Sequence, residues 1–290
     1  MHTFANHVKT AILLGGLMGL FVLVGSYWGA DGMITALVFG GIMNVGAWFF
    51  SDKLAIAAMR GREVTPDSPV IGPAGVELYR TVDELRRRAG LPMPRVYVCP
   101  HDAPNAFATG RSPRKAAVAV TQGLLRTMDH AELEGVIAHE LAHIKNRDTL
   151  ISCIAATIAG VLAMIAQWFF FFGGGRREGG HPFLGFITVM LAAVGAAVIQ
   201  AMISRSREFI ADADGARIAG RPDGLASALA KLDALARRIP LVQPNPAQNN
   251  LFIVEPLAGS GRSLLNIFAT HPPVEQRIAA LNRMREDMTL

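Results

Sequence analysis

Two histidines and a glutamate fall within five consecutive residues in the middle of the chain, in the run His139-Glu140-Leu141-Ala142-His143. On a helix, residues four apart lie on one face, so both imidazoles can approach one metal ion. Imidazole nitrogens bind zinc at about 2.0–2.1 Å, and Glu140, offset by about 100°, can reach a water molecule without binding the metal. Zinc acidifies such a water and a carboxylate removes its proton, which is the chemistry of a hydrolase. The spacing therefore predicts one zinc ion per chain, with Glu140 as a catalytic residue.

The elements that must position this motif begin with long apolar stretches. Hydrophobic residues make up 51% of the 290 residues and charged residues only 18%, against about 25% in a typical soluble protein. Four runs approach or exceed the roughly 18 residues that cross a bilayer as a helix. These predicted spans are Ala11–Trp28, Met33–Phe50, Leu150–Phe172 and Phe183–Ile203. The first could instead be a signal peptide, and the last two could be buried core helices.

Basic residues predict the orientation of these spans. They concentrate between the second and third runs and after the fourth, whereas the first hairpin turn, Gly29–Gly32, has none. The second turn, Gly173–Pro182, carries Arg176 and Arg177 as a small exception. An excess of Lys and Arg marks cytoplasmic segments, so both termini and the soluble parts are expected in the cytoplasm. Because the net charge of +5 has this distribution, and no basic groove with interleaved aromatics accompanies it, nucleic acid is not expected as a partner.

The predicted fold class is α+β, with four transmembrane helices and a mainly helical metal-binding domain that carries a small β-sheet. Cys99 and Cys153 lie in different contexts and are expected to be small buried residues without a disulfide. In the soluble parts we expect five helices. The first covers about 74–89, and the second starts at about 129 and is amphipathic over 131–144. The third runs from after 203 to about 219, the fourth covers 225–238, and the last starts near 272. Strands are expected at 95–98, 105–110 and 116–121, and a loop at 239–262. The expected domains are an N-terminal transmembrane hairpin at 1–52, a first cytoplasmic part at 53–149, a second transmembrane hairpin at 150–203 and a second cytoplasmic part at 204–290.

A catalytic zinc needs a third protein ligand. In one known arrangement this ligand follows the first histidine by ten residues, with a glycine at the seventh, but those positions hold Thr149 and Asn146. Glu178 lies in the turn predicted on the far side of the membrane, whereas Glu208 follows the fourth run on the near side. The topology therefore favours Glu208. Asp212, one turn later, is expected to hold a ligand histidine through its second N–H; the alternative is an ordinary surface carboxylate.

Several motifs together resemble the M48 family of metallopeptidases, and within it the heat-shock protease HtpX branch. The zinc motif is followed by Ile144-Lys145-Asn146-Arg147-Asp148, and three further stretches occur in the family's order. They are Asn105-Ala106-Phe107-Ala108-Thr109-Gly110, Ser204-Arg205-Ser206-Arg207-Glu208-Phe209-Ile210-Ala211-Asp212, and Thr270-His271-Pro272-Pro273 with Arg277-Ile278 behind it. The four-span plan covers nearly the whole chain.

The resemblance implies a zinc-metalloprotease of the bacterial inner membrane, with its active site facing the cytoplasm, that degrades damaged or misfolded membrane proteins under stress. It carries Glu208 over as the third zinc ligand. It also implies that Asn105–Gly110 is an edge strand to which an extended substrate adds backbone hydrogen bonds, with Asn105, Ala106, Phe107 and Ala108 as substrate-binding residues; the alternative is a plain hairpin.

His271 has two interpretations. The resemblance implies a catalytic donor to the oxyanion that forms during peptide hydrolysis, with Arg277 supporting the site. Alternatively, His271 is a helix-start residue before Pro272.

Three functions compete at this point. The first is a membrane-anchored zinc endopeptidase of broad specificity, whose partners are unfolded or membrane-protein substrates and the lipid bilayer. The second is a narrower processing protease for lipid-linked substrates, although four spans are few for the enclosed chamber that such relatives have. The third is a catalytically silent membrane scaffold. The intact set of His139, Glu140, His143 and Glu208 argues against the third, and the sequence gives no indication of an oligomeric state.

Overall fold

The computed structural model describes residues 48–67, 72–155, 182–236 and 271–288, together with positions 34, 38, 42, 45 and 46. The first predicted span, most of the second and third, nearly all of the turn between the third and fourth, and the loop expected at 239–262 lie outside these residues. In the part of the chain that is described, no helix combines the length and the hydropathy needed to cross a membrane. The four spans therefore stay predictions.

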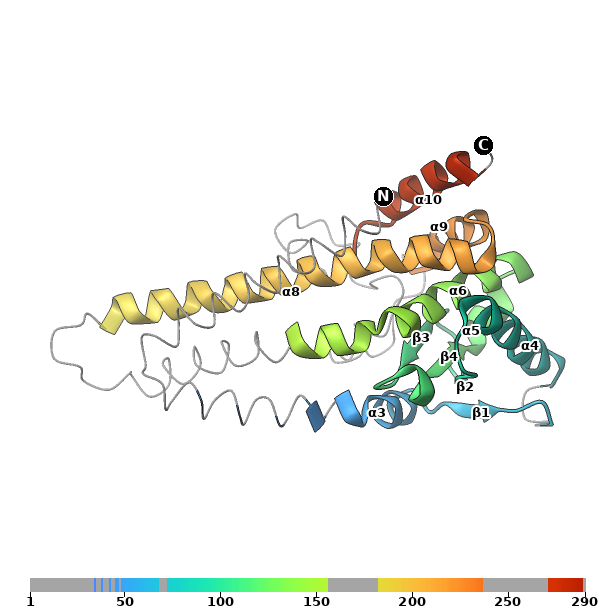
Figure 1. The fold of residues 1–290 in the computed structure, drawn as a ribbon, viewed down its shortest axis with the longest axis horizontal. Helices are drawn as coiled ribbons and strands as arrows, with labels where there is room; N and C mark the ends of the chain where they lie inside the picture. Colours follow the sequence, from blue (N-terminus) through green and yellow to red (C-terminus); the bar gives the residue numbers. More distant parts are fainter. Residues whose placement is uncertain are drawn as a thin grey trace.

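The described elements follow one another as helices around a small sheet (Figure 1). Most of the predicted helices and strands are present, within a few residues of their expected bounds. β1, α3, α5 and η2 are additional. The order is α3 (Ser51–Ala58), β1 (Arg62–Val64), α4 (Gly72–Ala89), β2 (Arg95–Cys99), β3 (Ala106–Thr109), η2 (Pro113–Lys115), β4 (Ala117–Thr121), α5 (Gln122–Thr127), α6 (His130–Asn146), α8 (Pro182–Ala219), α9 (Asp223–Ala236) and α10 (Val274–Met288).

The sheet has the order β1-β2-β4-β3, so β3 is an edge strand, as predicted. β2 and β4 pair in parallel, and the outer strands pair antiparallel with them. β4, with the sequence AVAVT, is buried along its whole length, which suits the central position of an apolar, β-branched strand. β1 has only three residues, too few for a recognisable alternation of apolar and polar positions.

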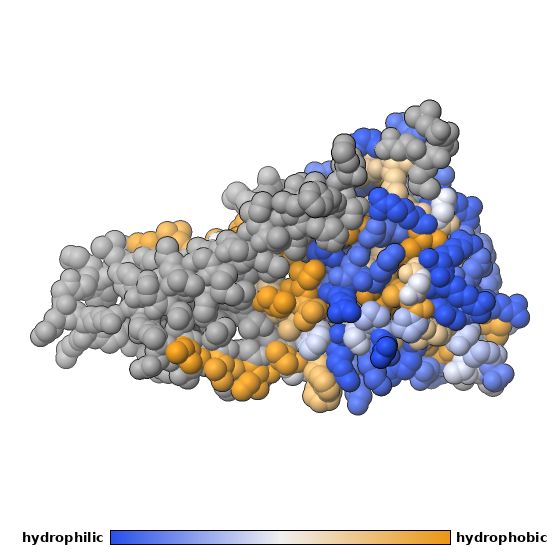
Figure 2. Space-filling model, viewed as in Figure 1, coloured by the Kyte–Doolittle hydropathy of each residue, from blue (hydrophilic) through white to orange (hydrophobic). Residues whose placement is uncertain are grey.

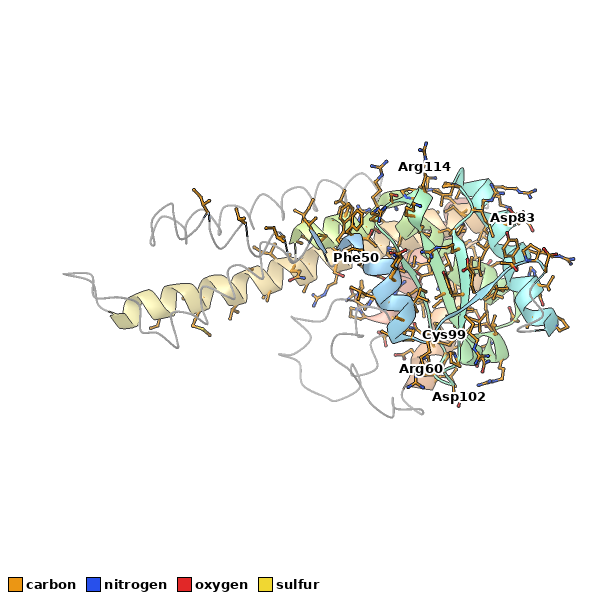
Figure 3. The ribbon with its side chains drawn as sticks, turned by 90° about the horizontal axis from the view of Figure 1, so that it is seen from below. Phe50, Arg60, Asp83, Cys99, Asp102 and Arg114 are labelled. Atoms are coloured by element: carbon orange, nitrogen blue, oxygen red, sulfur yellow. The ribbon has the colours of Figure 1, made fainter. Side chains whose placement is uncertain are left out.

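Helices cover both faces of the sheet. On one face, α4 and α6 form the main core with alternate residues of β2 and β4, among them Val96, Val98 and Val118. On the other face, α3 covers Tyr97, Cys99 and other small or aromatic side chains. Figure 3 locates Phe50 immediately before the first residue of α3. α3 follows the second predicted span directly in the sequence, and its Ala55 packs in this cluster.

α6 differs from its predicted amphipathic character. Apart from its exposed or half-exposed ends, nearly every residue from Glu132 to Ile144 is buried, because α4, the strands β3 and β4, α8 and α9 all contact this helix. Close approach to α9 requires Gly135, where a Cβ atom would lie 2.4 Å from the backbone nitrogen of Leu225. A helix that is surrounded in this way is apolar on most sides, so its sequence carries only a weak amphipathic signal.

α8 is one continuous helix of 38 residues. It joins the fourth predicted span to the helix that was expected after Ile203, and Figure 1 shows it running beside α6 and extending well beyond the sheet. Neither cysteine is part of a disulfide, as expected; Cys99 is buried, whereas Cys153 is partly exposed, unlike the prediction.

Candidate metal centre

α6 carries the two histidines, and its ends are well defined. At the N-terminus, Asp129 accepts a hydrogen bond from the backbone N–H of Glu132, whose carboxylate accepts one from the backbone N–H of Asp129, a capping box that satisfies two unpaired donors. At the C-terminus, Arg147 adopts a left-handed conformation and ends the helix. Between these caps, His139 and His143 are one turn apart, and their Nε2 atoms lie 3.1 Å from each other.

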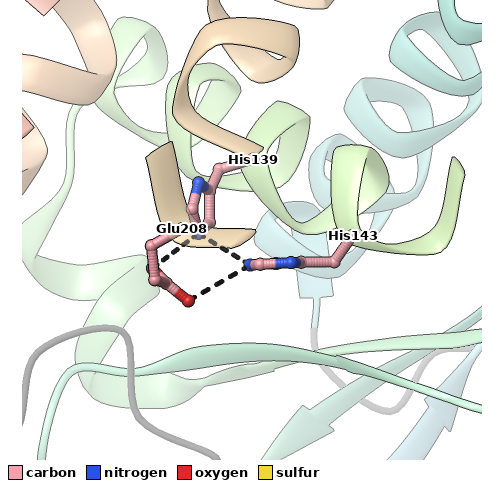
Figure 4. Close-up of side chains that lie close together, drawn as sticks. All are labelled: His139, His143 and Glu208. Carbon is pink, nitrogen blue, oxygen red and sulfur yellow. Dashed lines mark hydrogen bonds and ion pairs between the residues drawn. The ribbon is translucent and has the colours of Figure 1, made fainter. Parts of the chain in front are cut away.

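α8 brings Glu208 to the same point, as the sequence topology predicted. Its Oε2 atom is 3.6 Å from Nε2 of His139, and its Oε1 atom is 3.6 Å from Nε2 of His143. Figure 4 shows the two imidazoles and the carboxylate converging on a common position. Within the described residues these three side chains form a group whose possible ligand atoms all lie within 4.8 Å of one another.

The spacing of these atoms fits a tetrahedral metal site. Ligand atoms about 2.0–2.1 Å from a tetrahedral zinc are separated by roughly 3.3 Å, close to the observed 3.1 and 3.6 Å. Two facing Nε2 atoms also cannot remain as bare lone pairs at 3.1 Å, so a proton or a metal cation has to lie between them. The donor set of two imidazoles and one carboxylate is one that zinc uses in catalytic sites.

Each histidine has a carboxylate beside its other nitrogen. Nδ1 of His139 lies 3.0 Å from Oδ1 of Asp212, and Nδ1 of His143 lies 2.6 Å from Oδ2 of Asp148. Such carboxylates keep the ring proton on Nδ1 and direct Nε2 toward a metal. The position of Asp212 is the one predicted, whereas Asp148 was not identified as a site residue.

Two buried arginines hold these carboxylates in place. Arg277, with no exposed surface, donates to Asp212 at 2.8 and 2.6 Å and lies 3.0 Å from Oε2 of Glu208. Arg207 donates to Asp148 through Nε at 2.6 Å and also contacts it through Nη2. Sequence reasoning identified Arg277 but missed Arg207, although it immediately precedes Glu208.

The buried charges around the three candidate ligands do not balance. Four carboxylates and two guanidinium groups are buried here, which leaves two negative charges uncompensated when the histidines are neutral. Burying unpaired charge is costly, and a divalent cation restores neutrality. The charged groups are Glu140, Asp148, Glu208, Asp212, Arg207 and Arg277.

The pKa shifts report the same attraction for positive charge. Burial lowers the pKa of His143, but its hydrogen bond to Asp148 and the charges of Asp148, Glu208 and Glu140 outweigh burial and raise this pKa to about 9. Burial raises the pKa of Glu208, yet the charges of His271 and Arg277 hold it well below 4.5. For Asp212, Arg277 likewise outweighs burial and lowers the pKa. Both carboxylates are therefore ionised near neutral pH, and Glu208 is available to a cation.

The predicted catalytic residues also lie at this site. Glu140 is buried on α6 beside His139, and its charge contributes to the pKa shifts of His143 and Arg277. His271 is mostly buried, and its Nδ1 atom lies 3.4 Å from Oε1 of Glu208. The C-terminal segment thus brings His271 to the carboxylate that faces both ligand histidines.

The four residues predicted to bind substrate lie at the edge of the sheet, but they differ in orientation. Asn105 is buried and exchanges hydrogen bonds with Thr121, from its N–H to Oγ1 and from the N–H of Thr121 to its carbonyl. In an antiparallel pair, the backbone N–H and C=O groups of alternate residues bond to the neighbouring strand. The backbone groups of Phe107 therefore point toward β4, and those of Ala106 and Ala108 point to the open edge. The side chain of Phe107 packs under α3.

A family model agrees with this geometry. The model of peptidase family M48 matches residues 75–285, which include every residue of the site. The matched region covers well over half of the chain. The chain belongs to this family and is a metallopeptidase that hydrolyses peptide bonds.

Curated relatives align along nearly the whole chain. A protein of Desulforapulum autotrophicum named Protease HtpX homolog is 48% identical over 95% of this chain and 89% of its own length. One of the same name from Desulfatibacillum aliphaticivorans is 50% identical over 97% and 90%. The crystal structure of S. mikatae Ste24p has the same fold, with a TM-score of 0.58 at 18% identity over 96% of this chain. The chain spans 66% of the length of Ste24p.

Proposed function

We propose that this protein is a membrane-anchored zinc endopeptidase that cleaves damaged or misfolded membrane proteins on the cytoplasmic side of the bacterial inner membrane. The observation that carries the proposal is the group of two imidazoles and one carboxylate. The buried charged residues at this site leave two negative charges uncompensated. His139, His143 and Glu208 hold the metal, while Asp148 and Asp212 orient the two imidazoles.

A zinc ion held there supplies a Lewis acid that makes water nucleophilic near neutral pH. Glu140 accepts a proton from that water and passes it to the departing amine, the work of a general base and then a general acid. His271 donates a hydrogen bond to the oxyanion that develops on the peptide carbonyl, an interaction strongest in the transition state. Arg277 keeps Glu208 and Asp212 ionised and in place.

An extended polypeptide supplies the substrate. Its backbone pairs with the outward-facing N–H and C=O groups of Ala106 and Ala108, adding a strand to β3. Backbone pairing recognises any unfolded segment, which supports broad specificity for damaged proteins over a single processing site.

Exposed apolar side chains support the membrane anchor. Ile34, Val38, Ile42 and Val45 are each more than half exposed. Figure 2 shows hydrophobic surface extending away from the hydrophilic part of the molecule. Met190, Leu191 and other residues on α8 are exposed as well. Exposed apolar side chains that gather on one surface mark contacts with a membrane or a partner. If the predicted spans cross a bilayer, lipid covers these side chains.

Cleavage assays on the full chain in detergent test the enzymatic proposal. Wild-type protein loaded with zinc should cut casein and a misfolded membrane protein. Glu140→Gln should lower the rate by about a thousandfold or more, since it removes the proton acceptor, while one zinc per chain is retained. Cleavage by this variant at a rate near that of wild type would remove Glu140 from the mechanism.

A reporter fusion tests the orientation. A reporter fused after Arg177 should be exported and one fused after Leu290 should not; the reverse pattern would contradict a cytoplasmic active site.

A further inference from the structure

The loop that follows β3 contacts the ends of two predicted spans. Arg111, in this loop, lies over Phe49 at the end of the second predicted span: its guanidinium carbon is 3.8 Å from the ring centre, and Nη1 donates a hydrogen bond of 3.3 Å to the Phe49 carbonyl. The preceding residue, Gly110, accepts a hydrogen bond of 2.9 Å from Oγ1 of Thr149, which immediately precedes the third predicted span. The loop is therefore expected at the cytoplasmic surface of the bilayer.

An exposed aromatic pair lies at this place. The rings of Phe49 and Phe50 meet edge to face with their centres 5.2 Å apart, and the two residues are 42% and 49% exposed. Leu54, one helical turn after Phe50, is 58% exposed. Segments that lie at a bilayer interface combine Phe, Trp and Leu on their apolar side with Lys and Arg on their polar side. The aromatic pair and Leu54 supply the apolar part of such an interface.

Two cations accompany the aromatic pair, one for each ring. Arg111 lies over Phe49, and the Lys53 ammonium is 6.0 Å from the ring centre of Phe50. Among the residues that the structure describes, no carboxylate forms an ion pair with either cation. Asp52, next to Lys53 in the sequence, is buried and pairs with Arg95 instead. Two positive charges beside exposed apolar side chains match a ligand that is both anionic and apolar, which is an anionic phospholipid.

We propose that Lys53 and Arg111 bind the headgroup of an anionic phospholipid at the surface of the bilayer. This inference rests on the membrane anchor of the proposed function. The lipid phosphate accepts hydrogen bonds from the guanidinium group and attracts the ammonium group, while the acyl chains cover the aromatic pair and Leu54. A zwitterionic headgroup carries its own ammonium group and matches two cations less well. Because Gly110 joins β3 to Arg111, the bound lipid holds the open edge of β3 near the membrane surface.

Native mass spectrometry of the full-length protein in detergent tests the site, with phosphatidylglycerol or phosphatidylcholine added over a range of concentrations. Each cation near the headgroups contributes about fivefold, so wild type should bind phosphatidylglycerol about 25-fold more tightly than phosphatidylcholine. Lys53→Gln and Arg111→Gln should each lower this ratio about fivefold, and the double variant should bring it close to one. Arg60→Gln is the matched control, because Arg60 is exposed at the opposite end of α3 from Phe50 (Figure 3), and it should keep the full ratio.

Two further readouts separate lipid binding from folding and locate the site. Arg111→Lys keeps the positive charge, so its ratio should stay within about threefold of wild type. Phosphatidylglycerol should slow hydrogen–deuterium exchange at the backbone amides of residues 110–112 in wild type and not in the double variant.

A wild-type ratio near one, a ratio that the double variant leaves unchanged, or slowed exchange that spares residues 110–112 would overturn the lipid site. Displacement of phosphatidylglycerol by millimolar inorganic phosphate or by an acidic peptide would also overturn it, because the ligand would then be a soluble anion. If wild type stayed in solution without detergent and bound neither lipid, the membrane anchor itself would fail. An embedded protein without a preference between the lipids would refute this site alone.

Discussion

At the scale of single residues, the two candidate ligand histidines are supported in parallel ways. Each has a carboxylate at Nδ1, and each carboxylate is held by a buried arginine: Asp212 by Arg277 for His139, and Asp148 by Arg207 for His143. These pairs fix both the orientation of the rings and the nitrogen that carries the proton. The three candidate ligands could not be positioned as well without them.

Replacing Asp148 tests this support. Asp148→Asn removes the charge that favours proton retention on Nδ1 of His143, so zinc affinity should fall by about 10- to 100-fold, as measured by competition with a chelator. Asp214→Asn is the control, since Asp214 binds Asn146 and Arg217 instead and should leave the affinity unchanged. Equal affinities for both variants would show that His143 needs no carboxylate partner.

The sequence predicts this site unevenly, for physical reasons. His139, Glu140 and His143 follow from helical spacing, and Glu208 follows from the topology, because both depend on chain direction and periodicity. The position of Asp148 beside His143 depends on the left-handed backbone of Arg147, which redirects the chain after α6. No local sequence pattern specifies that turn. The role of Arg207 depends on the contact between α8 and that turn, through which Arg207 reaches Asp148. In the sequence, nothing distinguishes Arg207 from the other basic residues.

At the scale of elements, α6 and α8 must approach closely for the site to form. Gly215 on α8 lies against the backbone of His139; a Cβ atom there would lie 2.9 Å from both N and Cα of His139. Glycine is costly within a helix, so its presence here reflects the need for contact between the helices. The contact brings Asp212 and Glu208 to the histidines.

Gly215→Ala should therefore separate the two helices despite its better helix propensity. We expect a loss of about 1–3 kcal/mol in unfolding free energy from overpacking, with weaker zinc binding, measured by denaturant titration and chelator competition. At Gly46 a Cβ atom would have no neighbour within 4 Å, so Gly46→Ala should not reduce either quantity. A Gly215→Ala variant as stable as wild type would mean that the helices tolerate the added methyl group.

The start of α6 makes stability depend on pH. Burial raises the pKa of Glu132, but hydrogen bonds from Lys231, from the backbone of Asp129 and from Ser227 outweigh it and lower this pKa below its ordinary value of 4.5. A lowered folded-state pKa contributes stability that is complete above the ordinary pKa and is lost as the pH falls through the folded-state value. This carboxylate therefore stabilises the packing of α9 on α6 near neutral pH.

Glu132→Gln should thus cost about 1–3 kcal/mol of unfolding free energy at pH 7. The difference from wild type should shrink as the pH falls from 4.5 through the lower folded-state pKa of Glu132, because the wild-type side chain then becomes neutral, as glutamine already is. Thermal unfolding of both proteins across this range measures the effect. A difference that stayed constant with pH would contradict the assignment to the ionised carboxylate.

Elements whose existence depends on local pattern, such as α4, β2 and β4, are predictable within a few residues of their bounds. The burial of α6 could not be predicted from local pattern, because it results from contacts with elements that are distant in the sequence. The same is true of α8, whose apolar and polar halves look like separate helices in sequence and form one helix in the structure. Short pieces such as β1 and η2 carry too few residues for a pattern.

At the scale of the whole molecule, the candidate metal centre joins elements that lie before and after the predicted second hairpin. α6 belongs to the part before the predicted second hairpin, while α8 and the segment around His271 and Arg277 belong to the part after it. Buried charges from both parts meet at one point, and a divalent cation is what makes their meeting favourable. Metal binding and assembly of the domain are therefore expected to be coupled.

The most direct test is to locate the metal by anomalous diffraction at the zinc absorption edge, with crystals of the zinc-loaded full-length protein. One anomalous peak per chain is predicted, about 2.0–2.2 Å from Nε2 of His139, Nε2 of His143 and a carboxylate oxygen of Glu208. A peak bound by other side chains, or crystals of loaded protein without a peak between these three residues, would contradict the metal centre.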